Sequence, residues 1–281
     1  MSRRRELARR LSALSDIAGI LSAMKNLALM ETLILRDFLV SQQRMVAGIE
    51  GSAADFLAWH PEPIPAPTGG QGHALCVLVG SEQGFCGDFN ERIVAHLQAT
   101  DATAVPARWV IVGQRLATKL GEDPRTALQL TGASVADEVP AVLLRLTREL
   151  NHLLTTGDQA GAGLCVLYLD DASGDLRLRH LLPLGTRPPP ATAYPHAPTT
   201  NLPPAKLVAG LTRHYLYAAL NEVLYSALMA ENRQRQAHMD RALQRLDEQT
   251  GRLRRVYNAQ RQEEITEEIE IILLSADQLS G

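Results

Sequence analysis

LQRLDEQTGRLRRVYNAQRQEEITEEIEIILL, residues 243–274, contains no proline and one glycine, Gly251. The residues that step through it by three and four positions are Leu243, Leu246, Thr250, Leu253 and Tyr257, and they are followed by Ile265, Ile269, Ile272, Leu273 and Ala276. This spacing places side chains along one face of an α-helix. A proline inside a helix costs about 3 kcal/mol, so its absence lets one helix run through the whole stretch.

The positions of the prolines divide the rest of the chain. All 15 lie between Pro61 and Pro204, so both ends can form long helices. Near the N-terminus a heptad pattern recurs at Leu7, Leu14, Leu21, Ala28 and Leu35, with Leu11, Ile17 and Met24 at the alternate positions. Such a pattern is typical of a helix that supercoils with a partner helix. At about 1.5 Å per residue, helices of roughly 50 and 70 residues would be roughly 75 and 105 Å long. We therefore expect helices within 1–60 and 205–281 to pair as a long antiparallel coiled coil, in which the C-terminal helix overhangs its partner.

The segment between the helices, 61–204, predicts a small α/β, Rossmann-like domain. Short apolar runs predict strands at 74–79, 108–112 and 164–169, and helices are expected at 90–98, 114–120 and 138–154. Residues 170–175 have the composition of a turn, so 176–184 is expected to return as a hairpin strand. The alternation of strands and helices favours an open sheet covered by helices. Two proline-rich stretches, 60–70 and 187–204, are expected to be extended and stiff connections.

Composition excludes several classes of protein. A net charge of −3 gives no reason to expect a nucleic-acid binder. No uninterrupted apolar run reaches the ~18 residues typical of a membrane span, so we expect no direct membrane insertion. Three cysteines, Cys76, Cys86 and Cys165, are too few for a disulfide scaffold and suit a reducing compartment. The Arg-rich start is interrupted by Glu6 and Asp16 and continues the helical pattern, which indicates a mature cytoplasmic protein rather than a targeting segment.

The loop VLVGSEQGFCGDFN, residues 77–90, lies between a predicted strand and a predicted helix, where phosphate sites form in α/β folds. Its glycines, Gly80, Gly84 and Gly87, are spaced G-x3-G-x2-G, which matches neither the dinucleotide fingerprint nor the P-loop. A tight strand-to-helix turn is therefore the favoured interpretation. Cys86 has no histidine or cation beside it in the motif, so we expect a buried, inert thiol.

The other polar residues predict neither a metal site nor a catalytic site. The cysteines and His73 lack the paired spacings of zinc ligands. Asp170, Asp171 and Asp175 fall in the predicted turn, where aspartate is favoured for its own turn chemistry. The sequence contains no G-x-S-x-G or H-E-x-x-H motif. We expect a chain that is not itself catalytic and that holds no cofactor or metal.

Motifs in several regions of the chain occur together in one protein family. The pattern S-x-x-G-x-C-G-x-x-N is formed by Ser81, Gly84, Cys86, Gly87 and Asn90. The pattern Y-N-x-x-R-Q-x-x-I-T-x-E-I is formed by Tyr257, Asn258, Arg261, Gln262, Ile265, Thr266, Glu268 and Ile269. AMK at 23–25 and AENRQRQAHMD at 230–240 match two further segments of that family. Over essentially its whole length, the chain resembles the γ subunit of F-type ATP synthases.

The resemblance implies a central rotor shaft that couples transmembrane ion flow to ATP synthesis or hydrolysis. Its partners would be the α and β subunits of the catalytic head, which carry the nucleotide sites, together with the ε subunit and the membrane c-ring. Its location would be peripheral, at the cytoplasmic face of the bacterial inner membrane. By position, the residues that match the family's coupling positions are Met24, Lys25, Arg235, Arg261, Gln262, Thr266 and Glu268.

Gly19 and Ser22 depart from the family, which usually carries lysine at these positions. The missing positive charge indicates a divergent bacterial form, and we hypothesise one of the alternative complexes that translocate Na⁺.

A competing hypothesis is a stand-alone coiled-coil scaffold or adaptor with an α/β head. It accounts for the long helices but not for the C-terminal motif. A nucleotide- or metal-dependent enzyme that uses the 77–90 loop is a third hypothesis, and no complete phosphate or metal motif supports it.

Overall fold

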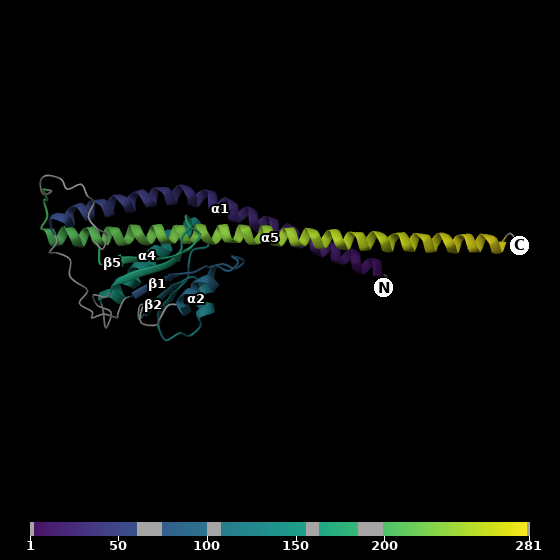
Figure 1. Ribbon diagram of the computed structural model, residues 1–281, viewed down its shortest axis with the longest axis horizontal. Helices are drawn as coiled ribbons and strands as arrows, with labels where there is room; N and C mark the ends of the chain where they lie inside the picture. Colours follow the sequence, from purple (N-terminus) through teal and green to yellow (C-terminus); the bar gives the residue numbers. More distant parts are fainter. Residues whose placement is uncertain (1–2, 61–74, 100–107, 156–162, 185–198, 280–281) are drawn as a thin grey trace. The chain divides into compact units, whose positions relative to one another are not determined.

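The computed structural model of the chain describes residues 3–60, 75–99, 108–155, 163–184 and 199–279. Two long helices, α1 (Arg3–Trp59) and α5 (Pro204–Leu279), are the first and last elements, as predicted (Figure 1). Most of both proline-rich stretches lies outside the described residues. The chain forms two compact units, one of residues up to Ala28 and from Gln236 on, the other of Leu29–Arg235.

The unit of Leu29–Arg235 contains a five-stranded sheet in the order β3-β2-β1-β4-β5. Its strands are β1 (Leu75–Val79), β2 (Arg108–Val112), β3 (Thr126–Leu130), β4 (Leu164–Leu169) and β5 (Leu176–Leu182). The first four strands are parallel, and β5 pairs with β4 as the antiparallel hairpin strand that the sequence predicts. Strand β3 is not among the predicted strands. It lies at the edge of the sheet and is only half-buried, so it lacks the continuous apolar run that reveals β1, β2 and β4.

Helices cover both faces of this sheet because alternate residues of a strand point to opposite sides. Cys76 and Leu78 of β1 pack with α2 (Phe89–Ala99) and α3 (Gln114–Leu120). Leu75, Val77 and Val79 belong to the other core, which contains residues of α1, of α4 (Val139–Thr155) and of α5 up to Met229 (Figure 1). A short 3-10 turn, Ala136–Glu138, precedes α4. The buried α5 residues between Tyr215 and Met229 are therefore part of the domain core.

Within the same unit, α1 and α5 run antiparallel. Phe38 stacks on Tyr225 at a ring-centroid distance of 5.4 Å. Further along α1, the Glu50 carboxylate accepts a hydrogen bond of 3.3 Å from the hydroxyl of Tyr215, which is earlier on α5. Residue numbers thus rise on one helix as they fall on the other, which confirms the predicted orientation.

The other unit is a pairing of the two helices without a sheet. Arg4 forms a 2.8 Å ion pair with Glu264, and Lys25 forms a 2.5 Å ion pair with Asp240, so the helices are antiparallel here too. The heptad prediction is wrong at Ile17, which is 45 % exposed. Ala18 is half-buried in its place, because steps of four and three from Leu14 to Leu21 pass through position 18.

The C-terminal face predicted from the 3–4 spacing is confirmed over its first part. The half-buried residues of α5 in this unit include Leu243, Leu246, Thr250, Leu253 and Tyr257. Since Arg4 already pairs with Glu264, the helix continues past the described start of α1. The apolar side chains there are exposed: Ile269 by 51 %, Ile271 by 66 % and Leu273 by 62 %.

Helix α1 satisfies a test for membrane spans that the prediction from uninterrupted runs overlooks. It contains an 18-residue window with a mean hydropathy of 1.4 and no more than two charged residues. By length and composition alone, α1 is therefore long and apolar enough to cross a membrane. One such helix is weak evidence of a membrane span, because core helices pass the same test. In the structure, Lys25 pairs with Asp240, and the Glu31 carboxylate accepts the backbone N–H of Ala136 at 3.1 Å.

Candidate functional site

The loop after β1 is held in shape by three residues of the S-x-x-G-x-C-G-x-x-N motif. The buried Ser81 donates its backbone N–H to Asn90 Oδ1 at 3.0 Å, and Asn90 Nδ2 donates back to Ser81 Oγ at 2.7 Å. The Cys86 thiol donates to the same Oγ at 3.2 Å. These bonds fasten the loop to the first turn of α2, so the motif builds a rigid strand-to-helix turn.

Glycine is required at two positions of this turn for different reasons. A Cβ on Gly80 would lie 2.2 Å from Leu116 Cβ, so α3 can approach the end of β1 only where no side chain intervenes. Gly87 has a φ of 64°, in the left-handed region that other residues adopt at a cost. The glycine pattern thus serves packing and turn geometry, as the sequence predicts.

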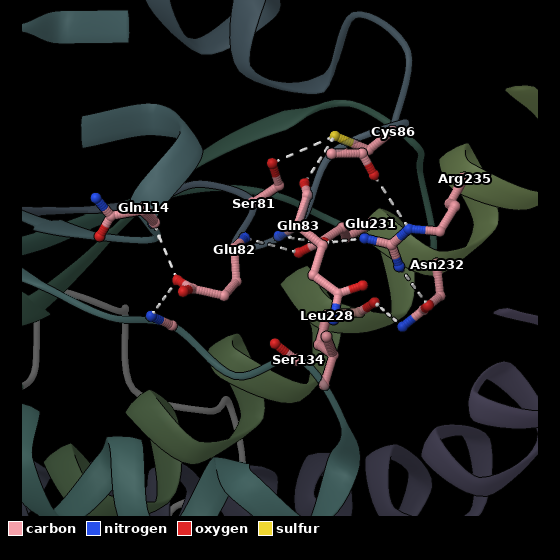
Figure 2. Close-up of polar contacts among 12 residues, drawn as sticks. Ser81, Glu82, Gln83, Cys86, Gln114, Ser134, Leu228, Glu231, Asn232 and Arg235 are labelled. Carbon is pink, nitrogen blue, oxygen red and sulfur yellow. Dashed lines mark hydrogen bonds and ion pairs between the residues drawn. The ribbon is translucent and has the colours of Figure 1, made fainter. Parts of the chain in front are cut away.

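Helix α5 grips the loop through a buried polar cluster (Figure 2). The two carboxylate oxygens of Glu231 accept the backbone N–H groups of Glu82 and Gln83, each at 3.3 Å. Arg235 donates to the Glu231 carboxylate, to Asn232 Oδ1 at 2.7 Å and to the Gly84 carbonyl at 3.3 Å. We call these three α5 residues and the backbone of residues 82–84 the loop–helix lock. Glu231, Asn232 and Arg235 are all buried, so the lock is internal to the unit.

Glu82 extends the network to the two neighbouring loops. Its Oε2 accepts the backbone N–H of Gln114 at 2.9 Å, at the start of α3, and that of Gly132 at 2.6 Å, after β3. The loops that follow β1, β2 and β3 are therefore joined by one side chain. In α/β folds this edge of the sheet is where phosphate groups bind to backbone N–H donors. In this chain, carboxylates of Glu82 and Glu231 already accept those hydrogen bonds.

Burial raises the pKa of two groups, Glu231 in the lock and Cys86 in the motif loop beside it. It raises the pKa of Glu231, although Arg235 and the backbone N–H groups of the loop act in the opposite direction. Burial also raises the pKa of the Cys86 thiol, with the hydrogen bond to Ser81 as a smaller opposing effect. Cys86 is thus buried and less readily ionised than an ordinary thiol, which agrees with the predicted inert role.

A second polar cluster ties both long helices to the sheet. Arg179 of β5 pairs with Glu50 of α1 at 2.9 Å and with Glu222 of α5 at 2.7 Å. Tyr215 adds its hydroxyl to Glu50, and an open cavity of about 570 Å³ lies beside the cluster. We call these four residues the Arg179 clamp. These contacts join α1, β5 and α5 within the sheet-containing unit.

The aspartates of the β4–β5 turn behave as turn residues, as predicted. Asp170 Oδ2 accepts the backbone N–H of Ser173 at 3.3 Å. The turn also contacts α5, because Ser226 accepts the Asp171 N–H at 3.1 Å and Arg233 pairs with Asp171 at 2.8 Å. Among the described residues, no group of three or more His, Cys, Asp or Glu side chains is arranged to hold a metal ion.

The residues proposed for coupling occupy three different environments. Arg235 is 5 % exposed and meets the motif loop in the lock. Met24 and Lys25 are half-buried on α1. The remaining four, Arg261, Gln262, Thr266 and Glu268, are exposed on α5.

Sequence reasoning does not single out Glu231 or Glu82. Glu231 has a detectable pattern, because it precedes Arg235 by one helical turn in a stretch that is polar all round. Glu82 has no such pattern, since its partners lie on two loops distant in sequence.

Comparison with known proteins gives one consistent family. A family model described as ATP synthase matches residues 3–279. The "ATP synthase gamma chain" of Chlorobaculum parvum is 28 % identical over 233 residues, which are 77 % of this chain and 77 % of that protein.

Solved structures show the same fold at low sequence identity. A chain of the Euglena gracilis mitochondrial ATP synthase, in an OSCP/F1/c-ring structure, matches with a TM-score of 0.61 and 16 % identity, covering 98 % of this chain and 94 % of that one. A chain of the Tetrahymena thermophila mitochondrial ATP synthase central stalk and c-ring matches with a TM-score of 0.54 and 16 % identity, covering 79 % of this chain and 99 % of that one.

Proposed function

Because the chain belongs to the ATP synthase family as a γ subunit, we propose that it is the central rotor shaft of an F-type rotary complex. The shaft couples transmembrane ion flow to ATP synthesis or hydrolysis in the catalytic hexamer of α and β subunits. The matched structures support this role, since one is a central stalk with a c-ring and the other an OSCP/F1/c-ring assembly.

The observation that carries the proposal is the change in environment along α5. Val223–Asn232 lie in the domain core, whereas the helix from Gln236 to Leu273 has mostly exposed or half-buried side chains. Exposed isoleucines near its end, Ile265 and Ile269, are a surface that a surrounding protein can bury. A helix that is core at one end and contact surface at the other suits an axle held inside a ring of subunits.

We assign different partners to the exposed part of α5 and to the sheet-containing unit. The α and β subunits surround the exposed part of α5, and the ε subunit and the membrane c-ring bind the sheet-containing unit. Catalysis belongs to the hexamer, and this chain changes the affinity of each catalytic site by presenting a different face to it. The complex lies at the cytoplasmic face of the bacterial inner membrane, with this chain peripheral to it.

The exposed polar pair Arg261 and Gln262 contacts the catalytic subunits and is the first candidate for coupling. Thr266 and Glu268 continue this exposed surface, and Met24 and Lys25 contribute from α1. Replacing Arg261 and Gln262 by alanine should impair ATPase activity or assembly while the isolated chain stays helical. Normal assembly, hydrolysis and ion-coupled synthesis in that variant would remove the pair from the coupling surface.

Co-expression with the α and β subunits of the same source tests the whole proposal. We expect one gel-filtration peak with one copy of this chain per hexamer, and ATPase activity that depends on it. If the chain elutes alone while the other two subunits fold and associate, the rotor role is wrong and the scaffold hypothesis replaces it.

A further inference from the structure

We propose that the loop–helix lock is the joint that transmits torque between the sheet-containing unit and α5, with Glu231 and Glu82 as positioning residues. The inference rests on the proposed rotor function and adds a role for Glu231, which lies in the matched segment 230–240, and for Glu82, which no family motif singles out. It makes Arg235 a residue that acts through the loop rather than by touching another subunit.

The bonds of the lock have the arrangement that would resist rotation of α5 about its own axis. Glu231 and Arg235 are one helical turn apart, and both hold the same short loop. Glu231 grips the N–H groups of two successive residues, while Arg235 grips the carbonyl of Gly84. Since donors and acceptors of the loop are held at once, a small turn of the helix would strain several hydrogen bonds together.

Glu82 connects the loop after β1 to the two neighbouring loops. Its backbone N–H is held by Glu231, and its carboxylate holds the N–H groups of Gln114 and Gly132. A force on α5 therefore reaches the ends of β1, β2 and β3 through one residue. Burial strengthens the bonds from Arg235 to Glu231 and Asn232 because competing water is excluded there.

The position of the lock fits a joint. Arg235 is the last residue of α5 that belongs to the sheet-containing unit, and the described side chains after it are mostly half-buried or exposed, with Met239 buried. The lock is therefore the final fixed point of α5 in that unit. Buried ion pairs are often replaceable by apolar residues without loss of stability, so stability alone gives no reason for charge here. The charges instead fix one geometry between helix and loop.

The test uses a double variant, Glu231→Leu with Arg235→Met, in the complete complex reconstituted into vesicles. Removing both charges together avoids leaving one of them buried and unpaired. ATP hydrolysis and ATP-driven ion uptake are measured side by side. We expect hydrolysis to stay within about twofold of the parent, while the ions moved per ATP fall about threefold or more, the size typical of a lost coupling interaction.

Matched variants distinguish the effect of losing the lock from the effect of removing two charges anywhere in the chain. Arg148→Met with Glu149→Leu makes the same exchange at an ion pair of α4 whose side chains are 74 % and 32 % exposed, and ions moved per ATP should be unchanged. Arg235→Lys retains the charge but loses the fork that reaches Asn232 and Gly84, so its ratio should be intermediate. Alkylation of Cys86, followed by mass spectrometry, reports on the loop, and it should be faster in the double variant.

Each outcome decides the question. Faster alkylation of Cys86 with an unchanged ion-to-ATP ratio would overturn the inference, because the loop would be released without loss of coupling. Slow alkylation with an unchanged ratio would also overturn it, since the lock would not depend on these side chains. Loss of the variant chain from the complex would assign the lock to assembly instead. If the parent chain itself fails to join the hexamer, the proposed function is wrong, and the parent measurement shows this separately.

Discussion

The two parts of α5, Pro204–Arg235 and Gln236–Leu279, share one continuous helix but differ in what surrounds them. In the first part, Val223–Asn232 are buried, and polar residues such as Glu231 are satisfied within the chain. In the second part, Val256, Ile265 and Ile269 are exposed. Regularly spaced apolar residues therefore do different things in the two parts of α5. Before Arg235 they pack in the domain core, and after it they pair with α1 or remain exposed.

The charged pairs differ in the same way. The Arg179 clamp is largely withdrawn from solvent, with exposed side-chain fractions of 16–24 %. In the second part of α5, Glu248 and Arg252 are 3.9 Å apart, with exposed side-chain fractions of 69 % and 74 %. Exposed pairs of this kind typically contribute less than about 1 kcal/mol. We therefore expect stability to depend on polar residues near the sheet and assembly to depend on the exposed part of the helix.

The largest effect on stability should come from Arg179→Met. The change leaves Glu50 and Glu222 without their shared cation in a largely buried cluster. Breaking such a pair costs about 3 kcal/mol in free energy of unfolding, measured by urea unfolding of the isolated chain. Arg177→Met is the matched control on the same strand, because its side chain is 62 % exposed. Equal destabilisation by the two variants would contradict the distinction between the clamp and the surface.

The opposite behaviour is expected for Ile269→Ser combined with Leu273→Ser. Both side chains are exposed, so the free energy of unfolding of the isolated chain should change by less than about 0.5 kcal/mol. In the complex, each loses roughly 1 kcal/mol or more of apolar burial, so the dissociation constant for the α and β hexamer should rise about thirtyfold or more. A titration monitored by fluorescence or calorimetry measures this. Unchanged affinity would show that the tip remains outside the partner surface.

The sequence predicts the parts of this molecule that depend on local patterns. The two helices follow from the absence of proline, and β1, β2 and β4 from their apolar runs. The lock could not be predicted, because Glu82 and Glu231 are 149 residues apart and only the packing of α5 on the loop brings them together. The motif residues Ser81, Cys86 and Asn90 are predicted as a turn, and their hydrogen bonds confirm that interpretation.

A pH experiment sharpens the description of the lock. Burial raises the pKa of Glu231 in the folded chain above its ordinary value of 4.5. At a pH between the ordinary pKa, which applies to the unfolded chain, and the raised pKa of the folded chain, Glu231 is protonated in the folded chain and ionised in the unfolded chain. The free energy of unfolding that Glu231 contributes therefore falls as the pH rises through this window. Glu231→Gln has no such titration. We expect the variant to gain stability relative to the parent on going from about pH 4.5 to neutral pH, measured by urea unfolding. A change of opposite sign would mean that Arg235 and the loop N–H groups outweigh burial.

The smallest effect should come from Lys25→Ala combined with Asp240→Ala, which removes an ion pair between α1 and α5 in the sheet-free unit. The side chains are about one-third or more exposed, so solvent screens the pair, and the cost of ordering the long Lys25 side chain opposes it. The free energy of unfolding should fall by only about 0.5 kcal/mol, and 0.5 M salt should reduce that difference further. A double-mutant cycle with the two single variants measures the coupling energy directly. A value comparable to that of the Arg179 clamp would show that polar contacts stabilise both parts of the helix pair equally, which would remove the contrast between them.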